Sequence, residues 1–239
     1  MTKNLLVSVI IPTIDGREKL LNRAVKSVKK QTYENIELII VNEGCLGNIQ
    51  RNIGINRANG KYIAFLDDDD EWLPDKIKLQ VEIMEKYSYV PLVTTYIDDR
   101  RYKKYIKKSP YMVTLNYILN KFTYNSTSSY MIRKSAIDKI GNFDENLVSA
   151  QEYELAIRLL SNKEIAICIP KVLVIQHESD DSISKNWKKR RIGISSVYKK
   201  HKEKFINSSM FNIIKIRIIC LIYRLGIGDL LIRLYNKKI

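Results

Sequence analysis

Apolar residues in the first part of the chain form short continuous runs that are separated by amphipathic stretches. The runs at residues 5–11, 36–41 and 62–66 are rich in β-branched and aromatic residues, which is typical of buried strands. Residues 17–31 carry apolar positions at helical spacing, and residues 47–59 are expected to form a second helix. Strand, helix and strand in succession predict βαβ units, and therefore a parallel sheet with right-handed crossovers.

The alternation of elements continues less regularly after Pro74. Helices are predicted after Pro74, at 135–140 and from 151 onward, and strands at 89–95, 128–132 and 165–174. Residues 97–124 lack a clear period and are long enough for a functional loop over a site. We therefore predict an α/β fold with a mostly parallel central sheet flanked by helices.

Acidic residues almost disappear near 185–210, which suggests a boundary. We predict a catalytic domain at residues 1–205 and a basic amphipathic helical extension at 206–239. The net charge of +15 is concentrated at that end, since residues 185–239 contain 15 Lys/Arg and 2 Asp/Glu. Residues 100–108 add six more basic residues, so the rest of the chain is mildly acidic. Such segregation indicates an anionic partner, which could be a membrane face, a phosphate-bearing substrate or nucleic acid.

The predicted extension has an apolar face interrupted by basic residues. Its longest apolar run, 218–223, is too short to cross a bilayer. A basic amphipathic helix can lie in the interface of an anionic membrane, and this is the partner we expect for it. The alternative is a terminal helix that packs on its own domain or on a second subunit.

The cysteines and the N-terminus indicate the compartment. Cys45, Cys168 and Cys220 are widely spaced and match neither a disulfide framework nor a zinc site. The N-terminus lacks the pattern of a secretory signal. We therefore expect a protein of the reducing cytoplasm.

Four consecutive aspartates, 67–70, directly follow the predicted strand at 62–66. Carboxylates at the end of a strand in an α/β sheet are typical of a site for Mg²⁺ or Mn²⁺, with substrate phosphates completing the metal shell. The alternative is a solvated turn that caps the helix after Pro74. The neighbouring strand ends would place Thr13 and Glu43 at the same edge of the sheet, where nucleotides bind.

Several segments occur together in an informative order. They are VSVIIPT at 7–13, KKQTY at 29–33, IELIIVNEG at 36–44, RNIGINRANGKYIAFLDDDDEWLPDK at 51–76, GNFDENL at 141–147 and QEYELAIRL at 151–159. In this order they resemble family 2 of the glycosyltransferases, inverting enzymes with the GT-A fold that include capsule and O-antigen polysaccharide enzymes. The resemblance covers residues 5–185. It implies a nucleotide-diphosphate sugar donor, usually a UDP-sugar, bound through a divalent cation, Mn²⁺ or Mg²⁺.

The resemblance assigns the metal to Asp69, the end of the DxD-type motif, with His177 as a further ligand or diphosphate contact. Asp67 and Asp68 match positions that contact the donor ribose and assist the metal site. Asp70 and Glu71 are expected to cap the following helix. A lone histidine such as His177 is otherwise an ordinary loop residue.

The donor base and the acceptor are assigned in the same way. Pro12 and Thr13 match the loop that lines the base, and Glu43 matches the acidic residue that accepts the uracil N3–H. Arg51 matches a contact to base or diphosphate, with a surface salt bridge as the alternative. Glu152 matches the catalytic base, which takes the proton from the acceptor hydroxyl.

The chain departs from the family pattern at a few positions. Glu152 stands where the family has Asp, which lengthens the side chain by one methylene and changes its reach. Glu154, two residues on, is expected to be solvated. Ile14 replaces an aromatic residue, and Asn42-Glu43 replaces a frequent Asp pair. Only six residues lie between Gly44 and Arg51, where many relatives have an additional helix and strand.

The leading functional hypothesis is an inverting glycosyltransferase at the inner face of the cell membrane. It would act on a lipid-linked oligosaccharide in bacterial surface polysaccharide synthesis, with its tail on anionic lipid; a homo-oligomer is possible and no nucleic-acid partner is expected. One alternative is a nucleotidyltransferase, which shares strand-end aspartates. Another is a non-catalytic basic protein that binds membrane or nucleic acid through the same fold.

Overall fold

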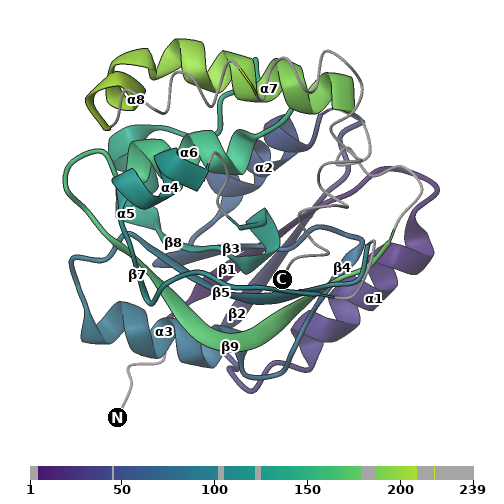
Figure 1. Cartoon of the computed structure of the whole chain (residues 1–239). Helices are drawn as coiled ribbons and strands as arrows, with labels where there is room; N and C mark the ends of the chain where they lie inside the picture. Colours follow the sequence, from purple (N-terminus) through teal and green to yellow (C-terminus); the bar gives the residue numbers. More distant parts are fainter. Residues whose placement is uncertain are drawn as a thin grey trace.

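One sheet of nine strands organises the structure, and helices cover both of its faces (Figure 1). The computed structural model describes residues 5–44, 46–101, 105–121, 125–178, 187–208 and 218. The predicted membrane-binding extension at 206–239 falls outside these residues except at 206–208 and 218. No helix in the described ranges is long and apolar enough to cross a membrane.

The strand order is β2-β1-β3-β8-β5-β9-β4, with β6 on β5 and β7 on β9. The longer strands β2, β1, β3, β5 and β9 run in one direction, whereas the short β8, inserted between β3 and β5, is antiparallel to both. This confirms the mostly parallel sheet expected from the sequence. The strands are β1 (Val7–Pro12), β2 (Ile36–Val41), β3 (Tyr62–Phe65), β4 (Asp70–Trp72), β5 (Leu92–Asp99), β6 (Tyr105–Lys107), β7 (Met112–Val113), β8 (Met131–Arg133) and β9 (Ala166–Gln176).

Two helices pack on one face of the sheet and the others gather on the opposite face (Figure 1). Helices α1 and α3 lie on the first face, and α2, α4, α5 and α6 lie on the second. Helices α7 and α8 form an outer layer over α4 and α6. The helices are α1 (Glu18–Lys29), α2 (Gly47–Arg57), α3 (Lys76–Lys86), α4 (Leu115–Lys121), α5 (Lys134–Ile140), α6 (Gln151–Leu159), α7 (Trp187–Lys200) and α8 (Lys202–Ser208), with a 3₁₀ turn η1 at Thr127–Ser129.

Burial on both faces explains why β3 is an unbroken apolar run. In β3, Tyr62 and Ala64 belong to the core under α1 and α3, whereas Ile63 and Phe65 belong to the core under the opposite helices. Successive side chains of a strand point to opposite faces, so a strand covered on both sides must be apolar at every position.

The structure differs from the sequence-based expectation mainly between 89 and 132. The strand predicted at 89–95 begins at Leu92, and the irregular stretch at 97–124 contains β6, β7 and α4. The strand predicted at 128–132 begins as η1, because Ser126 caps this turn by accepting a hydrogen bond from the Ser128 backbone N–H. Short polar elements of this kind have no clear apolar period.

The close approach of α2 to β1 gives a test of the packing. Gly54 of α2 faces Ile10, and a Cβ built at Gly54 would lie 2.4 Å from Cγ2 of Ile10. Gly54→Ala should therefore lower the free energy of unfolding by about 1–3 kcal/mol through overpacking, although alanine is the better helix former by about 1 kcal/mol. Chemical denaturation measures this, with the exposed Asn56→Ala of the same helix as control. A Gly54→Ala variant as stable as the control would contradict the packing.

Candidate functional site

The four aspartates lie where β3 ends, directly beside the end of β1. The Leu66 backbone N–H donates to the Ile10 carbonyl at 3.0 Å, which continues the pairing of the two strands up to the acidic run. The Thr13 backbone N–H donates to the Val41 carbonyl at 2.9 Å and to Gln50 Oε1 at 3.0 Å. The carboxyl ends of β1, β2 and β3 therefore meet at one edge, as the sequence predicted.

Asp68 is held by the loop and helix that follow β1. Its carboxylate accepts a bidentate pair of hydrogen bonds from Arg17, both at 2.8 Å, and a bond from the Thr13 hydroxyl at 2.7 Å. The Asp69 carboxylate lies 3.2 Å from the same guanidinium. The two carboxylates raise the pKa of Arg17, mainly through the hydrogen bonds of Asp68. Arg17 was not predicted from the sequence; the need to neutralise adjacent carboxylates was its only signal.

Asp67 is bound by Arg51 of α2. The Arg51 Nη2 atom lies 2.5 Å from Asp67 Oδ1, and its Nη1 atom lies 3.4 Å from Gln151 Oε1 at the start of α6. The guanidinium also lies over the Phe143 ring, 5.8 Å from its centroid. Arg51 is therefore no surface salt bridge. It is a buried link between the aspartates and helix α6.

Asp70 is buried and corrects one expectation. It does not cap a helix, because it begins strand β4 and α3 starts only at Lys76. Its carboxyl group accepts hydrogen bonds from the Ser128 hydroxyl at 2.5 Å and from Gln176 at 3.2 Å. Burial, together with the carboxylates of Asp69 and Asp67, raises the pKa of Asp70 well above its ordinary value. Glu71 lies in the same strand and likewise caps no helix.

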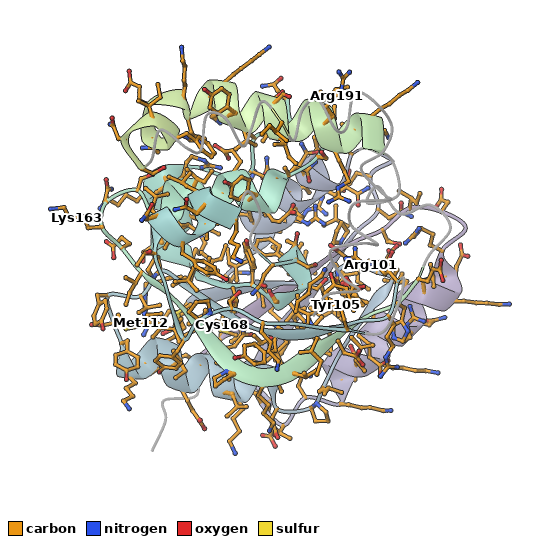
Figure 2. The ribbon with its side chains drawn as sticks, in the orientation of Figure 1. Arg101, Tyr105, Met112, Lys163, Cys168 and Arg191 are labelled. Carbon is orange, nitrogen blue, oxygen red and sulfur yellow. The ribbon has the colours of Figure 1, made fainter. Side chains whose placement is uncertain are left out.

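Gln176 extends this polar network to β6. Its amide oxygen accepts from Lys107 Nζ at 2.8 Å, and Lys107 also lies 2.7 Å from Asp99 Oδ2. Arg101 binds the same carboxylate at 2.7 Å. Burial lowers the pKa of Lys107 to about 8 and raises that of Tyr105 to about 12. Arg101 and Tyr105 lie beside the open end of the sheet in Figure 2. These residues were not predicted as part of the site, because residues 97–124 show no clear apolar period.

Glu152 lies in the first turn of α6, directly after Gln151, whose side chain contacts Arg51. The backbone enters this helix through Ala150, whose φ of 59° is unusual for a residue other than glycine. Burial raises the pKa of Glu152, with the positive charge of Arg51 acting in the opposite direction. The Asp67 carboxylate adds to the increase. The charges of Arg51 and Asp67 therefore both act on Glu152, at the start of the helix that Arg51 links to Asp67.

Polar side chains of α2 hold the loop that precedes α6. The Asn52 amide donates to the Phe143 carbonyl at 3.0 Å, and its oxygen accepts from the Phe143 backbone N–H at 2.9 Å. The Asn48 amide donates to the carbonyls of Asp144 and Leu147 at 3.0 and 3.2 Å. The segments 51–76 and 141–147 are therefore parts of one contact, which positions Glu152 relative to the aspartates.

The predicted base-binding residues lie at the outer side of this edge. Pro12 ends β1 opposite Val41. The Glu43 carboxylate is exposed and lies 2.8 Å from Arg57 of α2. Thr13 joins Asp68 as described, whereas Glu43 contacts none of the aspartates. Its role toward a uracil base stays a prediction.

His177 contacts Glu71, two residues beyond the predicted metal residue Asp69. Its Nε2 atom is 3.2 Å from the Glu71 carboxylate, and burial and the positive charge of Arg23 lower its pKa. Within the described ranges, no three His, Cys, Asp or Glu side chains converge on a metal-ion position. Carboxylates do fit Mg²⁺ or Mn²⁺, which commonly bind through one or two carboxylates plus substrate phosphates. Asp69, beside Asp67, offers this donor set, and the share of His177 stays a prediction.

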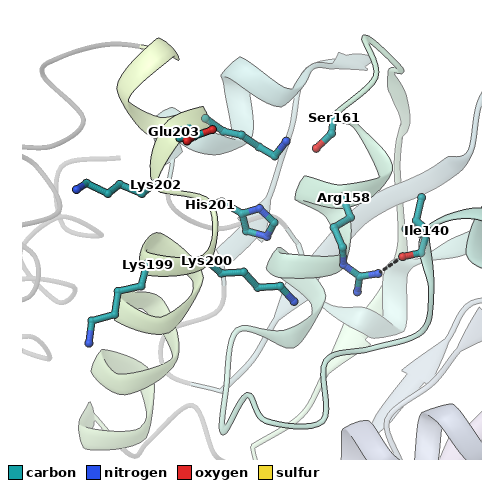
Figure 3. A pocket seen from close by; sticks show the side chains of 9 residues that line it. Ile140, Arg158, Ser161, Lys199, Lys200, His201, Lys202 and Glu203 are labelled. Carbon is teal, nitrogen blue, oxygen red and sulfur yellow. Dashed lines mark hydrogen bonds between the residues drawn. The ribbon is translucent and has the colours of Figure 1, made fainter.

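The prediction that Glu154 is exposed to solvent is wrong. Its side chain is fully buried and accepts from Arg158 at 2.8 Å, Lys200 at 2.9 Å and His201 at 3.0 Å. These hydrogen bonds lower the pKa of Glu154 to about 2 against the opposing effect of burial. Lys200 also binds Asp144 at 2.6 Å. The cluster, part of which lines the pocket of Figure 3, ties α6 to the junction of α7 and α8.

The family described as "Glycosyl transferase family 2" matches residues 8–45 and 47–141. An uncharacterized glycosyltransferase of Rickettsia conorii is 34% identical over 126 residues, which are 42% of this chain and 21% of that protein. The putative colanic acid biosynthesis glycosyl transferase WcaA of Escherichia coli K12 is 28% identical over 260 residues, with 91% of this chain and 90% of that protein covered. The matched region spans between 16% and 58% of the length of the five curated relatives from Rickettsia, including the Rickettsia conorii protein.

Two solved structures share the fold. S. aureus TarS 1-349 in complex with UDP-GlcNAc has a TM-score of 0.63 at 16% identity, covering 81% of this chain and 66% of that chain. Mannosyltransferase PcManGT from Pyrobaculum calidifontis, in complex with GDP-Man and Mn²⁺, has a TM-score of 0.60 at 12% identity, covering 93% and 75%. At these identities the likeness concerns the fold alone.

The lowered pKa of Glu154 gives a pH-dependent prediction. A carboxylate with a depressed folded-state pKa stabilises the fold above its unfolded pKa, and this contribution disappears as the pH falls through the folded value. Glu154→Gln should therefore lower the free energy of unfolding by about 3 kcal/mol near pH 7, and the deficit should shrink between about pH 5 and pH 2. Urea denaturation across this range measures it, with the exposed Glu82→Gln as control. A deficit that does not change with pH would refute the ionic role.

Proposed function

Because the chain belongs to glycosyl transferase family 2, we propose that it transfers a sugar from a nucleotide-diphosphate donor to an acceptor hydroxyl with inversion. The observation that supports this most directly is the pairing across Arg51. Arg51 binds Asp67 at the end of β3 and Gln151 at the start of α6, and Glu152, whose pKa is raised by burial, is the next residue of that helix. A leaving diphosphate and an attacking hydroxyl need these two kinds of group on opposite sides of the reacting carbon.

Glu152 would act as the base. A carboxylate with a raised pKa is a better proton acceptor once it is ionised. The positive charge of Arg51 acts against the increase and favours the charged form. The Gln151–Arg51 contact would hold the start of α6 at a fixed position relative to the donor.

The aspartates would bind the donor. We assign Asp69 to a divalent cation, Mn²⁺ or Mg²⁺, with Asp67 and Asp68 beside it; such an ion, when bound, stabilises the charge that develops on the leaving diphosphate. Arg17 would keep Asp68 and Asp69 oriented, because its guanidinium contacts both. We expect Pro12, Thr13 and Glu43 to surround the base, with a UDP-sugar as the donor.

The acceptor and the location follow from the relatives and the charge distribution. The relative that covers nine-tenths of this chain is named for colanic acid biosynthesis, and we propose a lipid-linked oligosaccharide of a bacterial surface polysaccharide as the acceptor. The protein would then work at the inner face of the cell membrane, with the basic residues 206–239 on anionic lipid. Family membership favours this activity over nucleotidyl transfer or a purely binding role.

Donor binding gives the first test. In a thermal-shift screen of nucleotide sugars, a UDP-sugar should raise the melting temperature more with Mn²⁺ present than without it, because the ion joins the diphosphate to Asp69. Asp69→Ala should abolish this Mn²⁺-dependent increase. The exposed Asp138→Ala serves as control. An Asp69→Ala variant with an unchanged Mn²⁺ response would remove the metal assignment, and a response to no nucleotide sugar would argue against the donor.

Proton transfer gives the second test. Glu152→Gln should leave the donor-induced thermal shift intact and slow sugar transfer, or UDP release, by about 10²–10⁴-fold. In the unmodified protein the rate should fall on the acid side at a pH above the ordinary glutamate pKa, because the base must be ionised and burial raises its pKa. Glu164→Gln is the matched control. Normal turnover in Glu152→Gln would discard this residue as the base.

A further inference from the structure

The outer layer formed by α7 and α8 has two different sides. Buried positions recur every four residues toward α4 and α6, at Gly193, Val197, His201 and Phe205. The Gly193 backbone packs so tightly on Ser149 that an added Cβ would lie 2.2 Å from its hydroxyl oxygen. The inner side is therefore fixed to the catalytic domain, and the outer side is left to face other molecules.

The outer side combines exposed lysines with exposed isoleucines. These side chains are all exposed on the outer side of the two helices. We call the set the α7–α8 face, and its members are Lys188, Lys189, Ile192, Lys199, Lys202 and Ile206. The side chains of Ile192 and Ile206 are 47% and 39% exposed. Lys199, Lys200 and Lys202 all line the pocket of Figure 3, where Lys199 and Lys202 point away from Arg158 and Lys200 points toward it. Figure 2 shows further nitrogen-tipped side chains that extend outward from this layer.

The charge of these helices is almost entirely of one sign. Residues 187–208 contain eight Lys/Arg and one acidic residue, Glu203. Lys200 binds Asp144 and Glu154 within the protein, whereas the side chains of Lys199 and Lys202 are exposed. An exposed surface of this composition attracts an anionic partner.

We propose that the α7–α8 face docks on an anionic lipid bilayer, which extends the membrane partner proposed above from the tail to the catalytic domain itself. Lysines around exposed aliphatic side chains match the interface of such a bilayer, where phosphates meet the lysines and acyl chains meet the isoleucines. Nucleic acid would use the lysines but not the isoleucines.

Docking through this face would hold the active site close to the bilayer. The face belongs to the layer that binds α6 through Glu154 and His201, and α6 carries Glu152. The helices would then lie between the bilayer and the base. A lipid-linked acceptor could reach Glu152 at the border of this layer without leaving the membrane.

Vesicle binding tests the proposal. The full chain should co-sediment with vesicles of phosphatidylglycerol and phosphatidylcholine, more weakly as salt increases, and not with phosphatidylcholine alone. Lys199→Glu together with Lys202→Glu should weaken binding about 25-fold or more, because each surface lysine contributes about fivefold. Lys78→Glu with Lys86→Glu on α3 makes the same change in net charge at the opposite side of the sheet and should have little effect. Ile192→Ser with Ile206→Ser should weaken the binding that remains at high salt.

Three results would overturn the proposal. They are equal loss in the α3 control, unchanged binding in the Lys199/Lys202 variant, and binding of the full chain to duplex DNA but not to vesicles. The donor-induced thermal shift, measured on the same variants, separates this proposal from the proposed function. A normal shift without vesicle binding removes only the docking face, and vesicle binding without any donor response removes only the transferase site.

Discussion

The neutralisation of four adjacent carboxyl groups is the constraint on which the site depends. Asp67 pairs with Arg51 from α2, Asp68 pairs with Arg17 from the start of α1, and Asp70 is buried against Ser128 and Gln176. Asp69 shares Arg17 and keeps part of its side chain exposed. Each partner comes from a different element, so the acidic run is tolerable only when those elements are assembled around it. The requirement for local neutralisation thereby fixes the geometry of the whole edge.

This constraint also explains why the sequence predicted the position of the aspartates at the sheet edge better than the residues that bind them. The apolar runs that form β1 and β3 are buried on both faces, and β2 is an apolar run at the edge of the sheet, so their pattern alone locates the strand ends and the aspartates. Arg17 and Gln176 have no periodic pattern, and their positions follow only from three-dimensional proximity. Asp70 and Glu154 were misjudged for the same reason, since an acidic residue seems solvated until its buried partners are known. Lys200 and His201 reach Glu154 from more than forty residues away.

Arg51 and the Glu154 cluster hold helix α6, which carries the proposed catalytic base Glu152, from two directions. Arg51 links Gln151 to Asp67 on the sheet side, and Glu154 joins α6 to α7 and α8 on the outer side. Helix α6 is short, and its own hydrogen bonds would define its position poorly. The two contacts, at Gln151 and Glu154, hold its first turn in place instead. The outer layer is thus part of the structure that sets the reach of Glu152, the residue at which this chain has one methylene more than its family.

The part of the site proposed to bind the nucleotide base is held by fewer buried contacts than the part around the aspartates. Only six residues separate Gly44 from Arg51, and β2 is the last strand of the described sheet on that side. Ile14, Ile40 and Leu46 are exposed there, and Glu43 is held only by an exposed ion pair with Arg57. Exposed pairs contribute little free energy, so these side chains can rearrange around different bases at low cost. The aspartates and Glu152, the residues proposed for sugar transfer, thus lie in the more constrained half of the site, whereas the half proposed to bind the nucleotide base is open and carries exposed aliphatic side chains.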